Sequence, residues 1–206
     1  MQVRIGIGGM HLDGSLELPA GAKSVVLFAH GSGSSRFSPR NNYVARVLRD
    51  HGLGTLLFDL LTREEDQSYG NRFDIDLLSA RLSATTNWLL GRPEAAGTSL
   101  GFFGASTGAA AALQASTIFS QVHAIVSRGG RPDLAWKHLG KVTAPTLLIV
   151  GGMDEEVLQF NRRALDQLGV EKDLAVVSGA THLFEEPGAL EKVATIATEW
   201  FLRFLG

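Results

Sequence analysis

The chain has 206 residues, of which 45% are hydrophobic and 19% charged, and this length and composition predict one folded domain over residues 1–206. With 19 basic and 21 acidic residues the formal net charge is −2, so we expect no binding to nucleic acid or to a membrane surface. No cysteine is present, which excludes disulfides, thiolate nucleophiles and cysteine-ligated metal centres.

The N-terminal residues do not have the pattern of a targeting segment. Residues 1–7 lack the long apolar core and the small-residue cleavage site of a secretory signal. The longest apolar runs, such as residues 145–153, are far too short to cross a bilayer. We therefore expect a cytoplasmic protein.

Short apolar, β-branched runs alternate with longer amphipathic stretches along the chain. In order, the predicted strands are residues 3–8, 12–18, 24–29, 55–59, 99–104, 122–127, 146–150 and 174–178. Several of them are continuously apolar, which is typical of strands covered on both faces in a parallel sheet. The first two have no helix between them, so we expect them to form an antiparallel hairpin at an edge.

The stretches between the later strands have the periodicity of helices. They are predicted at residues 41–51, 75–89 (entered through Asp74), 107–119, 156–168 and 193–204. This rhythm predicts an α/β fold with a mostly parallel eight-stranded sheet and helices on both faces. In such sheets, catalytic groups gather beyond the carboxyl ends of the strands.

A glycine-rich loop, His30-Gly31-Ser32-Gly33-Ser34-Ser35, follows the third strand. It partly matches a dinucleotide-binding fingerprint, and Asp59, at the end of the next strand, occupies the place of a ribose-binding acid. However, Arg36 replaces the third glycine and the next helix starts late, so nucleotide binding is disfavoured. We expect His30 to hydrogen-bond the loop and to take no part in catalysis.

The segment Gly104-Ala105-Ser106-Thr107-Gly108 matches the G-x-S-x-G nucleophile elbow between a predicted strand and a predicted helix. The turn pushes the serine hydroxyl outward, and glycines two residues away avoid side-chain collisions. We expect Ser106 to be a nucleophile and the N–H groups of Ser32 and Thr107 to form an oxyanion hole, with Gly31 as the alternative to Ser32. Otherwise, this is a small-residue turn in which Ser106 only caps the helix.

Several residues near these strand ends are candidates for substrate binding. Arginine can hold a carboxylate in bidentate geometry, and four arginines flank the loops: Arg36, Arg40, Arg128 and Arg131. For all four, a surface role in which they solvate two loops is the simpler interpretation. Gly31, Arg36, Arg128 and Leu183 are the residues predicted to contact substrate.

An acid and a histidine lie at two later strand ends. Asp154 follows Gly151-Gly152, and His182 lies in the loop before the last helix. A serine needs an imidazole to take its proton, and a carboxylate to orient that imidazole. Taken alone, Asp154 would be a turn residue and His182 a solvent-exposed one, but together with Ser106 they predict a catalytic triad. Three other acidic residues compete for the role of the acid: Glu155, Glu156 and Asp133.

Four segments together resemble the α/β-hydrolase superfamily, specifically its small dienelactone hydrolase-like branch. They are residues 30–35, residues 104–108, Ser127-Arg128-Gly129-Gly130-Arg131-Pro132-Asp133 and Gly179-Ala180-Thr181-His182-Leu183-Phe184. The resemblance extends over nearly the whole chain and implies ester hydrolysis by a Ser–His–Asp triad, with no cofactor. Cap domains of this superfamily follow the sixth strand, where this chain has only a short stretch, so we expect no cap domain.

The residues and the resemblance together predict a serine carboxylesterase that cleaves small soluble esters through an acyl-enzyme, as a monomer or homodimer. Dienelactone hydrolases use a cysteine nucleophile, so the serine here favours a simple esterase over a lactonase. Lactonase, thioesterase and acyltransferase activities use the same chemistry and remain alternatives. A non-catalytic binding protein with the hydrolase fold is a further alternative.

Overall fold

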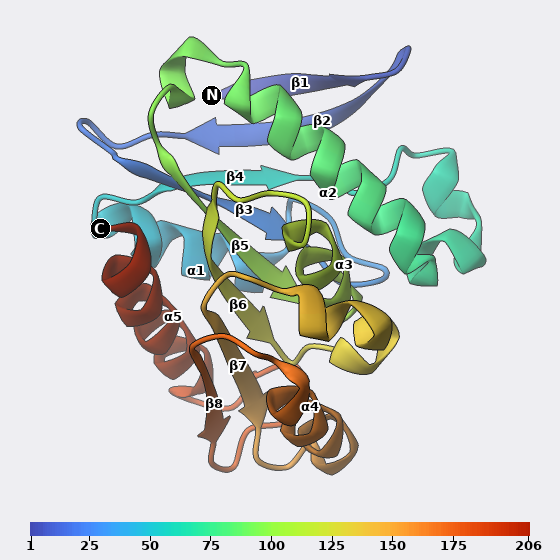
Figure 1. Ribbon diagram of the computed structural model, residues 1–206, viewed down its shortest axis with the longest axis vertical. Coiled ribbons are helices and arrows are strands. Elements are labelled where there is room, and N and C mark those ends of the chain that lie inside the picture. Colours follow the sequence, from blue (N-terminus) through green and yellow to red (C-terminus); the bar gives the residue numbers. More distant parts are fainter.

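A single sheet of eight strands runs through the computed structural model, which describes residues 1–206 (Figure 1). The strands lie in the order β1-β2-β4-β3-β5-β6-β7-β8. At one edge β1 (Gln2–Ile7) and β2 (Met10–Glu17) form an antiparallel hairpin, and β2 is also antiparallel to β4 (Gly54–Phe58). All other neighbours are parallel and involve β3 (Ser24–Ala29), β5 (Ser99–Ala105), β6 (Val122–Arg128), β7 (Thr146–Gly151) and β8 (Lys172–Val177). The predicted hairpin and mostly parallel sheet are confirmed.

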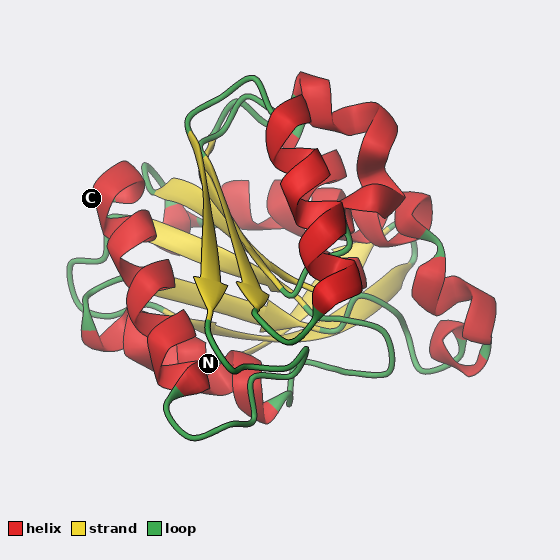
Figure 2. Cartoon of the chain, turned by 90° about the horizontal axis from the view of Figure 1, so that it is seen from below, coloured by secondary structure: helices red, strands yellow, loops and turns green.

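Helices cover both faces of the sheet (Figure 2). The helices on one face are α1 (Pro39–Asp50) and α5 (Ala189–Leu205), which pack against each other. The helices on the other face are α2 (Ile75–Leu90), α3 (Thr107–Ser116) and α4 (Glu155–Gln167). The expected α/β architecture with helices on both faces is therefore confirmed.

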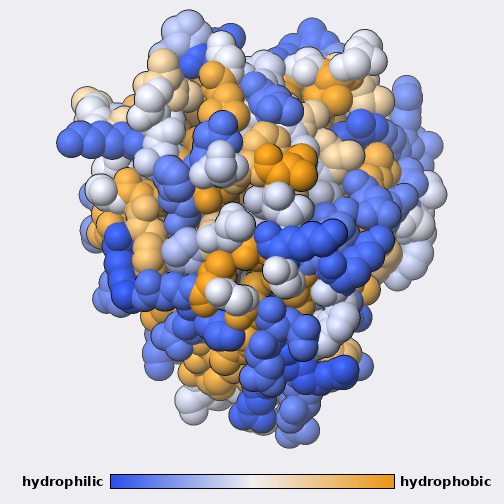
Figure 3. Space-filling model, viewed as in Figure 1, coloured by the Kyte–Doolittle hydropathy of each residue, from blue (hydrophilic) through white to orange (hydrophobic).

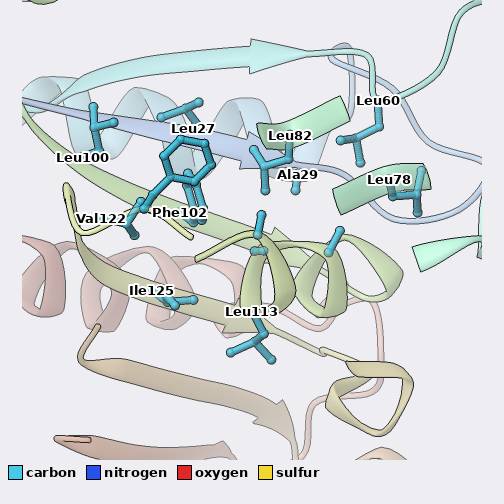
Figure 4. Packing of buried hydrophobic residues seen from close by; sticks show 14 of the residues in the cluster. Leu27, Ala29, Leu60, Leu78, Leu82, Leu100, Phe102, Leu113, Val122 and Ile125 are labelled. Carbon is cyan, nitrogen blue, oxygen red and sulfur yellow. The ribbon is translucent and has the colours of Figure 1, made fainter. Parts of the chain in front are cut away.

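Strand β3 shows how the apolar runs build two cores at once. Every residue of β3 is buried, and successive side chains point to opposite faces. Val25 and Leu27 belong to the core beneath α2 and α3, part of which is drawn in Figure 4, whereas Val26 and Phe28 belong to the core beneath α1 and α5. Because both faces are covered, the strand has no need of alternating polar residues.

Local hydrogen bonds explain where the helices begin and end. As expected, α2 is entered through Asp74, whose carboxylate accepts the N–H of Leu77 at 2.9 Å. Helix α1 begins two residues earlier than predicted because Ser38 caps it and Pro39 occupies its first turn. Helix α3 ends three residues earlier than predicted, and the hydroxyl of Ser116 donates to a carbonyl of its last turn.

Four short 3-10 segments were not predicted from the sequence. They are η1 (Glu65–Gln67), η2 (Tyr69–Phe73), η3 (Pro93–Ala95) and η4 (Pro132–Lys141). The first two project from the body of the molecule between β4 and α2, at the right of Figure 1. Only η4 lies between β6 and β7, so the chain has no cap domain there, as expected.

No helix combines the length and hydrophobicity that crossing a membrane requires. On the face drawn in Figure 3, hydrophobic side chains are scattered among hydrophilic ones.

Candidate active site

Ser106 occupies a sharp turn between β5 and α3. Its φ is 51° and its ψ is −119°, an uncommon backbone conformation for a residue with a side chain. An added Cβ at Gly104 would lie less than 3.0 Å from the backbone of Ala109, and one at Gly108 less than 3.0 Å from the carbonyl of Ala29. Ser106 makes no capping hydrogen bond to α3, so a role as a helix cap is excluded. The geometry is that of the predicted elbow.

Asp154 and His182 lie in contact beyond the ends of β7 and β8. The imidazole Nδ1 is 2.6 Å from Asp154 Oδ2, a charge-assisted hydrogen bond in which Nδ1–H donates. The other ring nitrogen, Nε2, is therefore left as an acceptor. Asp154 precedes α4 without capping it, so its carboxylate is committed to the histidine.

The competing acids are placed elsewhere. Asp133 accepts two hydrogen bonds from the guanidinium of Arg131, at 2.9 and 2.8 Å. Glu155 and Glu156 lie in the first turn of α4, and neither bonds to His182. Among the predicted candidates, Asp154 alone contacts the imidazole.

Backbone contacts between the loops that follow β7 and β8 hold Asp154 and His182 in place. The N–H of Met153 donates to the carbonyl of Ala180 at 2.9 Å, and Gly151 packs against the same segment. After His182 the chain passes through Phe184, which is fully buried and has a φ of 57°. A buried side chain in this strained conformation anchors the histidine loop.

Ser106 and His182 line one open pocket of about 230 Å³. Gly31, Ser32, Arg128 and Leu183 line the same pocket. The structure thus brings together the predicted nucleophile, the predicted base and three of the four predicted substrate-contact residues. The hydroxyl of Ser106 makes no hydrogen bond to His182, and catalytic contacts of this kind often tighten only around a substrate.

Backbone N–H groups beside Ser106 are free to bind an anion. Thr107 is the first residue of α3, so its N–H has no acceptor within the helix. The N–H groups of Gly31 and Ser32 donate to no group of the protein. Gly31 packs directly against the nucleophile, since an added Cβ would lie 3.1 Å from Ser106 Cβ. Thr107 adjoins the serine in the chain, and the contact of Gly31 with Ser106 keeps Gly31 as an alternative to Ser32 for the second donor.

His30 holds the loop that carries these donors, as the sequence predicted. Its Nδ1 lies 2.9 Å from the carbonyl of Gly31, and its Nε2 accepts the N–H of Leu60 at 3.0 Å. Both contacts are satisfied only by a neutral ring with its proton on Nδ1. Burial lowers the pKa of His30 below its ordinary value of 6.5, and the hydrogen bond to the Gly31 carbonyl and the nearby acids Asp59 and Asp66 only partly offset this.

The lowered pKa of His30 predicts an acid-sensitive fold. The unfolded chain takes up the proton more readily, so His30 stabilises the native state fully above about pH 6.5, and this stabilisation is lost as the pH falls toward its folded pKa. Urea unfolding should show the free energy of unfolding falling by up to about 1.4 kcal/mol per pH unit in that window. His30→Gln should flatten this part of the profile, whereas His123→Gln, at an exposed position, should leave it unchanged.

The arginines occupy three different environments. Arg36 does not line this pocket. Its guanidinium pairs with Asp59 and Asp13, and its backbone N–H donates to Asp59 at 2.7 Å. The predicted substrate contact at Arg36 is therefore not supported, because two carboxylates already neutralise its charge. Asp59 likewise binds Arg36, which leaves it no role as a ribose-binding acid.

Arg128 is buried, so it does not have the surface role that is the simpler interpretation of its sequence context. Only 7% of it is exposed, and its one hydrogen bond runs to Asn41 Oδ1 at 3.4 Å. Leu183, by contrast, is partly exposed at the pocket rim. No three side chains of the metal-binding types lie close enough to hold a metal ion.

A mostly parallel eight-stranded sheet with a serine at a strained strand–helix turn and a His–Asp pair at later strand ends defines an α/β hydrolase. The model of the dienelactone hydrolase family matches residues 12–205. The chain belongs to the dienelactone hydrolase family.

One solved relative agrees with this assignment, whereas two curated relatives carry a different name. A dienelactone hydrolase crystal structure from Anabaena variabilis is 53% identical, with a TM-score of 0.98, over 100% of this chain and 98% of that one. Est1E from Butyrivibrio proteoclasticus, at 17% identity and a TM-score of 0.83 over 98% of each chain, shows the fold alone. Mycobacterium tuberculosis proteins named "Putative phosphoribosyl transferase" are 54% identical over 205 residues, 99% of this chain. The chain spans 46% of the length of these curated relatives. Family and neighbours together define a hydrolase of the α/β type.

Proposed function

We propose that this chain is a serine carboxylesterase that hydrolyses small esters through an acyl-enzyme. The observation that carries the proposal is the 2.6 Å contact between His182 Nδ1 and Asp154 Oδ2, with His182 lining the same pocket as Ser106. A carboxylate bonded to Nδ1 fixes the tautomer and orientation that a general base needs, and here that base lies beside a serine at a strained turn.

Each residue has one role in the proposed reaction. Ser106 Oγ attacks the ester carbonyl while His182 Nε2 takes its proton, and Asp154 stabilises the imidazolium that forms. The N–H groups of Thr107 and Ser32 bind the oxyanion of the tetrahedral intermediate. His182 returns the proton to the departing alcohol and then activates the water that releases the acid.

The size of the pocket supports a small substrate. At about 230 Å³, and with no cap domain after β6 to extend it, it is a small pocket. Only two of its 11 lining residues, Ala105 and Leu183, are hydrophobic. A short acyl or alkoxy group fits this pocket better than a long lipid chain, which needs an extended apolar channel.

Covalent labelling tests the proposed nucleophile. Incubation with a fluorophosphonate should add one adduct to the chain, and peptide mass spectrometry should place it on Ser106. The reagent reacts only with a serine whose proton an adjacent base removes, so an inert surface serine remains unmodified. Intact mass before and after incubation is the measurement.

Ser106→Ala is the matched control, and Ser34→Ala removes a second hydroxyl of the same pocket. The first variant should take up no label, and the second should be labelled as the parent is. A folded parent that stays unlabelled would remove the serine mechanism and favour a binding protein with the hydrolase fold.

Lactone hydrolysis is the second candidate, favoured by the 53% identical structure named as a dienelactone hydrolase. A lactone is a cyclic ester, so the same attack on the carbonyl opens the ring. Parallel assays on aryl acetates and small lactones would rank the two activities. The phosphoribosyl transferase name belongs to proteins of which more than half lies outside the match, so it carries no proposal for this chain.

A further inference from the structure

Arg128 is a buried cation without an acidic partner. It ends β6, next to the elbow strand, and the N–H of Ser106 donates to its carbonyl at 3.2 Å. Its side-chain Nε is buried and has no hydrogen-bond partner, and the only hydrogen bond of the guanidinium is the long one to Asn41. The guanidinium also lies over the ring of Phe184, 5.8 Å from its centroid, a contact that supplies no counter-charge. A guanidinium removed from water normally acquires a carboxylate, because an unpaired buried charge costs several kcal/mol. Arg128 instead opens onto the pocket of Ser106.

A second guanidinium adds to the positive potential at this place. Arg40 lines the same pocket and pairs at 3.0 Å with Glu185, a largely exposed carboxylate. Burial, together with the positive charge of Arg40, lowers the pKa of Arg128 to about 10. Two cations therefore line the pocket, and the one carboxylate paired with them, Glu185, lies outside its lining.

Neutral polar side chains line the same pocket as the two guanidinium groups. Asn41 uses its Oδ1 for Arg128, and its Nδ2 amide makes no bond within the protein. Ser38 accepts the N–H of Asn41 at 3.3 Å, so its own hydroxyl proton is free to donate. Ser34 contributes a further hydroxyl to the lining. These groups are all donors, and none is an acidic acceptor.

We infer that this part of the pocket is a phosphate subsite, with Arg128 as its specificity-determining residue, and that the substrates are small esters carrying a phosphate group. The inference rests on the proposed esterase function and names its substrate class. A carboxylate has one charge and two oxygens, which a single arginine satisfies. Two guanidinium groups with an amide and two hydroxyls match the charge and the three terminal oxygens of a phosphate dianion.

The phosphate takes no part in the reaction. Ser106 breaks the carboxylic ester bond, the alcohol leaves with the proton returned by His182, and one water then releases the acid. The phosphate group remains attached to its half of the substrate throughout. Arg128 contributes by placing the carbonyl within reach of Ser106, which raises kcat/KM for phosphorylated esters over neutral ones.

Calorimetry with inorganic phosphate tests the subsite without any turnover. At about pH 8, Ser106→Ala should bind phosphate with a Kd on the order of 1 mM, and acetate at least about tenfold more weakly. Adding Arg128→Gln should weaken phosphate binding on the order of a hundredfold, because a charged hydrogen-bond partner is lost. Adding Arg46→Gln, which removes an exposed arginine of α1, should leave the affinity unchanged. Arg40→Gln, expected to weaken binding about tenfold, provides a second test should Arg128→Gln not fold.

Inhibition kinetics tie the subsite to catalysis. Phosphate should inhibit the hydrolysis of 4-nitrophenyl acetate by the unaltered chain competitively, with a constant matching the calorimetric Kd. No phosphate binding, or equal binding with and without Arg128, would overturn the subsite, and tighter acetate binding would overturn the assignment to phosphate. A chain that binds phosphate but cleaves no ester would instead overturn the esterase function and leave the subsite standing.

Discussion

Replacing His182 with alanine should lower kcat for 4-nitrophenyl acetate by a factor on the order of a hundred thousand to a million. The hydroxyl of Ser106 is a poor nucleophile until its proton is removed, and His182 is the only base lining the pocket. Steady-state hydrolysis with the thermal midpoint measured alongside separates lost chemistry from lost structure. The imidazole is partly exposed, so the midpoint should change little.

Asp154→Asn tests the proposed orienting role of the carboxylate apart from the proposed role of His182 as the base. The amide cannot stabilise an imidazolium and favours the wrong tautomer, so turnover should fall about ten-thousandfold. Glu155→Gln, one residue further on, should leave turnover within about twofold of the parent because its carboxylate does not contact the ring. A parent-like rate in Asp154→Asn would transfer the acid's role to a neighbour.

Gly108→Ala should abolish stable folding, the largest stability effect expected in this chain. The added methyl carbon would lie less than 3.0 Å from the carbonyl oxygens of both Ala29 and His30, which belong to the backbone of β3 and its loop. Neither can move without breaking the pairing of β3 with β5, so we expect a loss above about 4 kcal/mol. Urea unfolding, or the yield of soluble protein if the variant does not fold, is the measurement.

Gly140→Ala is the matched control, because an added Cβ there meets nothing within 4 Å and its backbone needs no positive φ. Its free energy of unfolding should stay within about 0.5 kcal/mol of the parent. A stable, active Gly108→Ala protein would show that β3 and α3 can separate more easily than their contact implies.

The sheet and the elbow were predictable because their signals are local. Continuously apolar runs mark strands covered on both faces, and every predicted strand lies within two residues of its observed bounds. The motif at residues 104–108 predicts its own turn geometry, because only glycine fits at positions 104 and 108, where a Cβ would collide with the backbone. The order of strand ends then indicated which loops would meet, although no spacing rule joins Asp154 to His182.

The arginines and the 3-10 segments were not predictable in the same way. Arg36 follows β3 and Arg128 ends β6, both in glycine-rich surroundings, yet one pairs with Asp59 and the other is buried without a carboxylate. Which partner each one meets depends on side-chain packing between distant elements. Likewise η1 and η2 are held by ion pairs such as Arg72–Asp66 and Arg81–Glu65. Such pairs produce no periodic pattern of apolar residues from which a segment could be predicted.

The proposed acid–base pair and the proposed nucleophile are held by separate parts of the structure. Asp154 and His182 are joined to each other and braced by the loops after β7 and β8, while Ser106 is presented by β5 and α3 with no hydrogen bond to the imidazole. An exchange of serine for cysteine at position 106 would therefore leave the imidazole and its carboxylate in place. With this arrangement the attacking atom can change during evolution while His182 and Asp154, the residues proposed to transfer the proton, keep their positions.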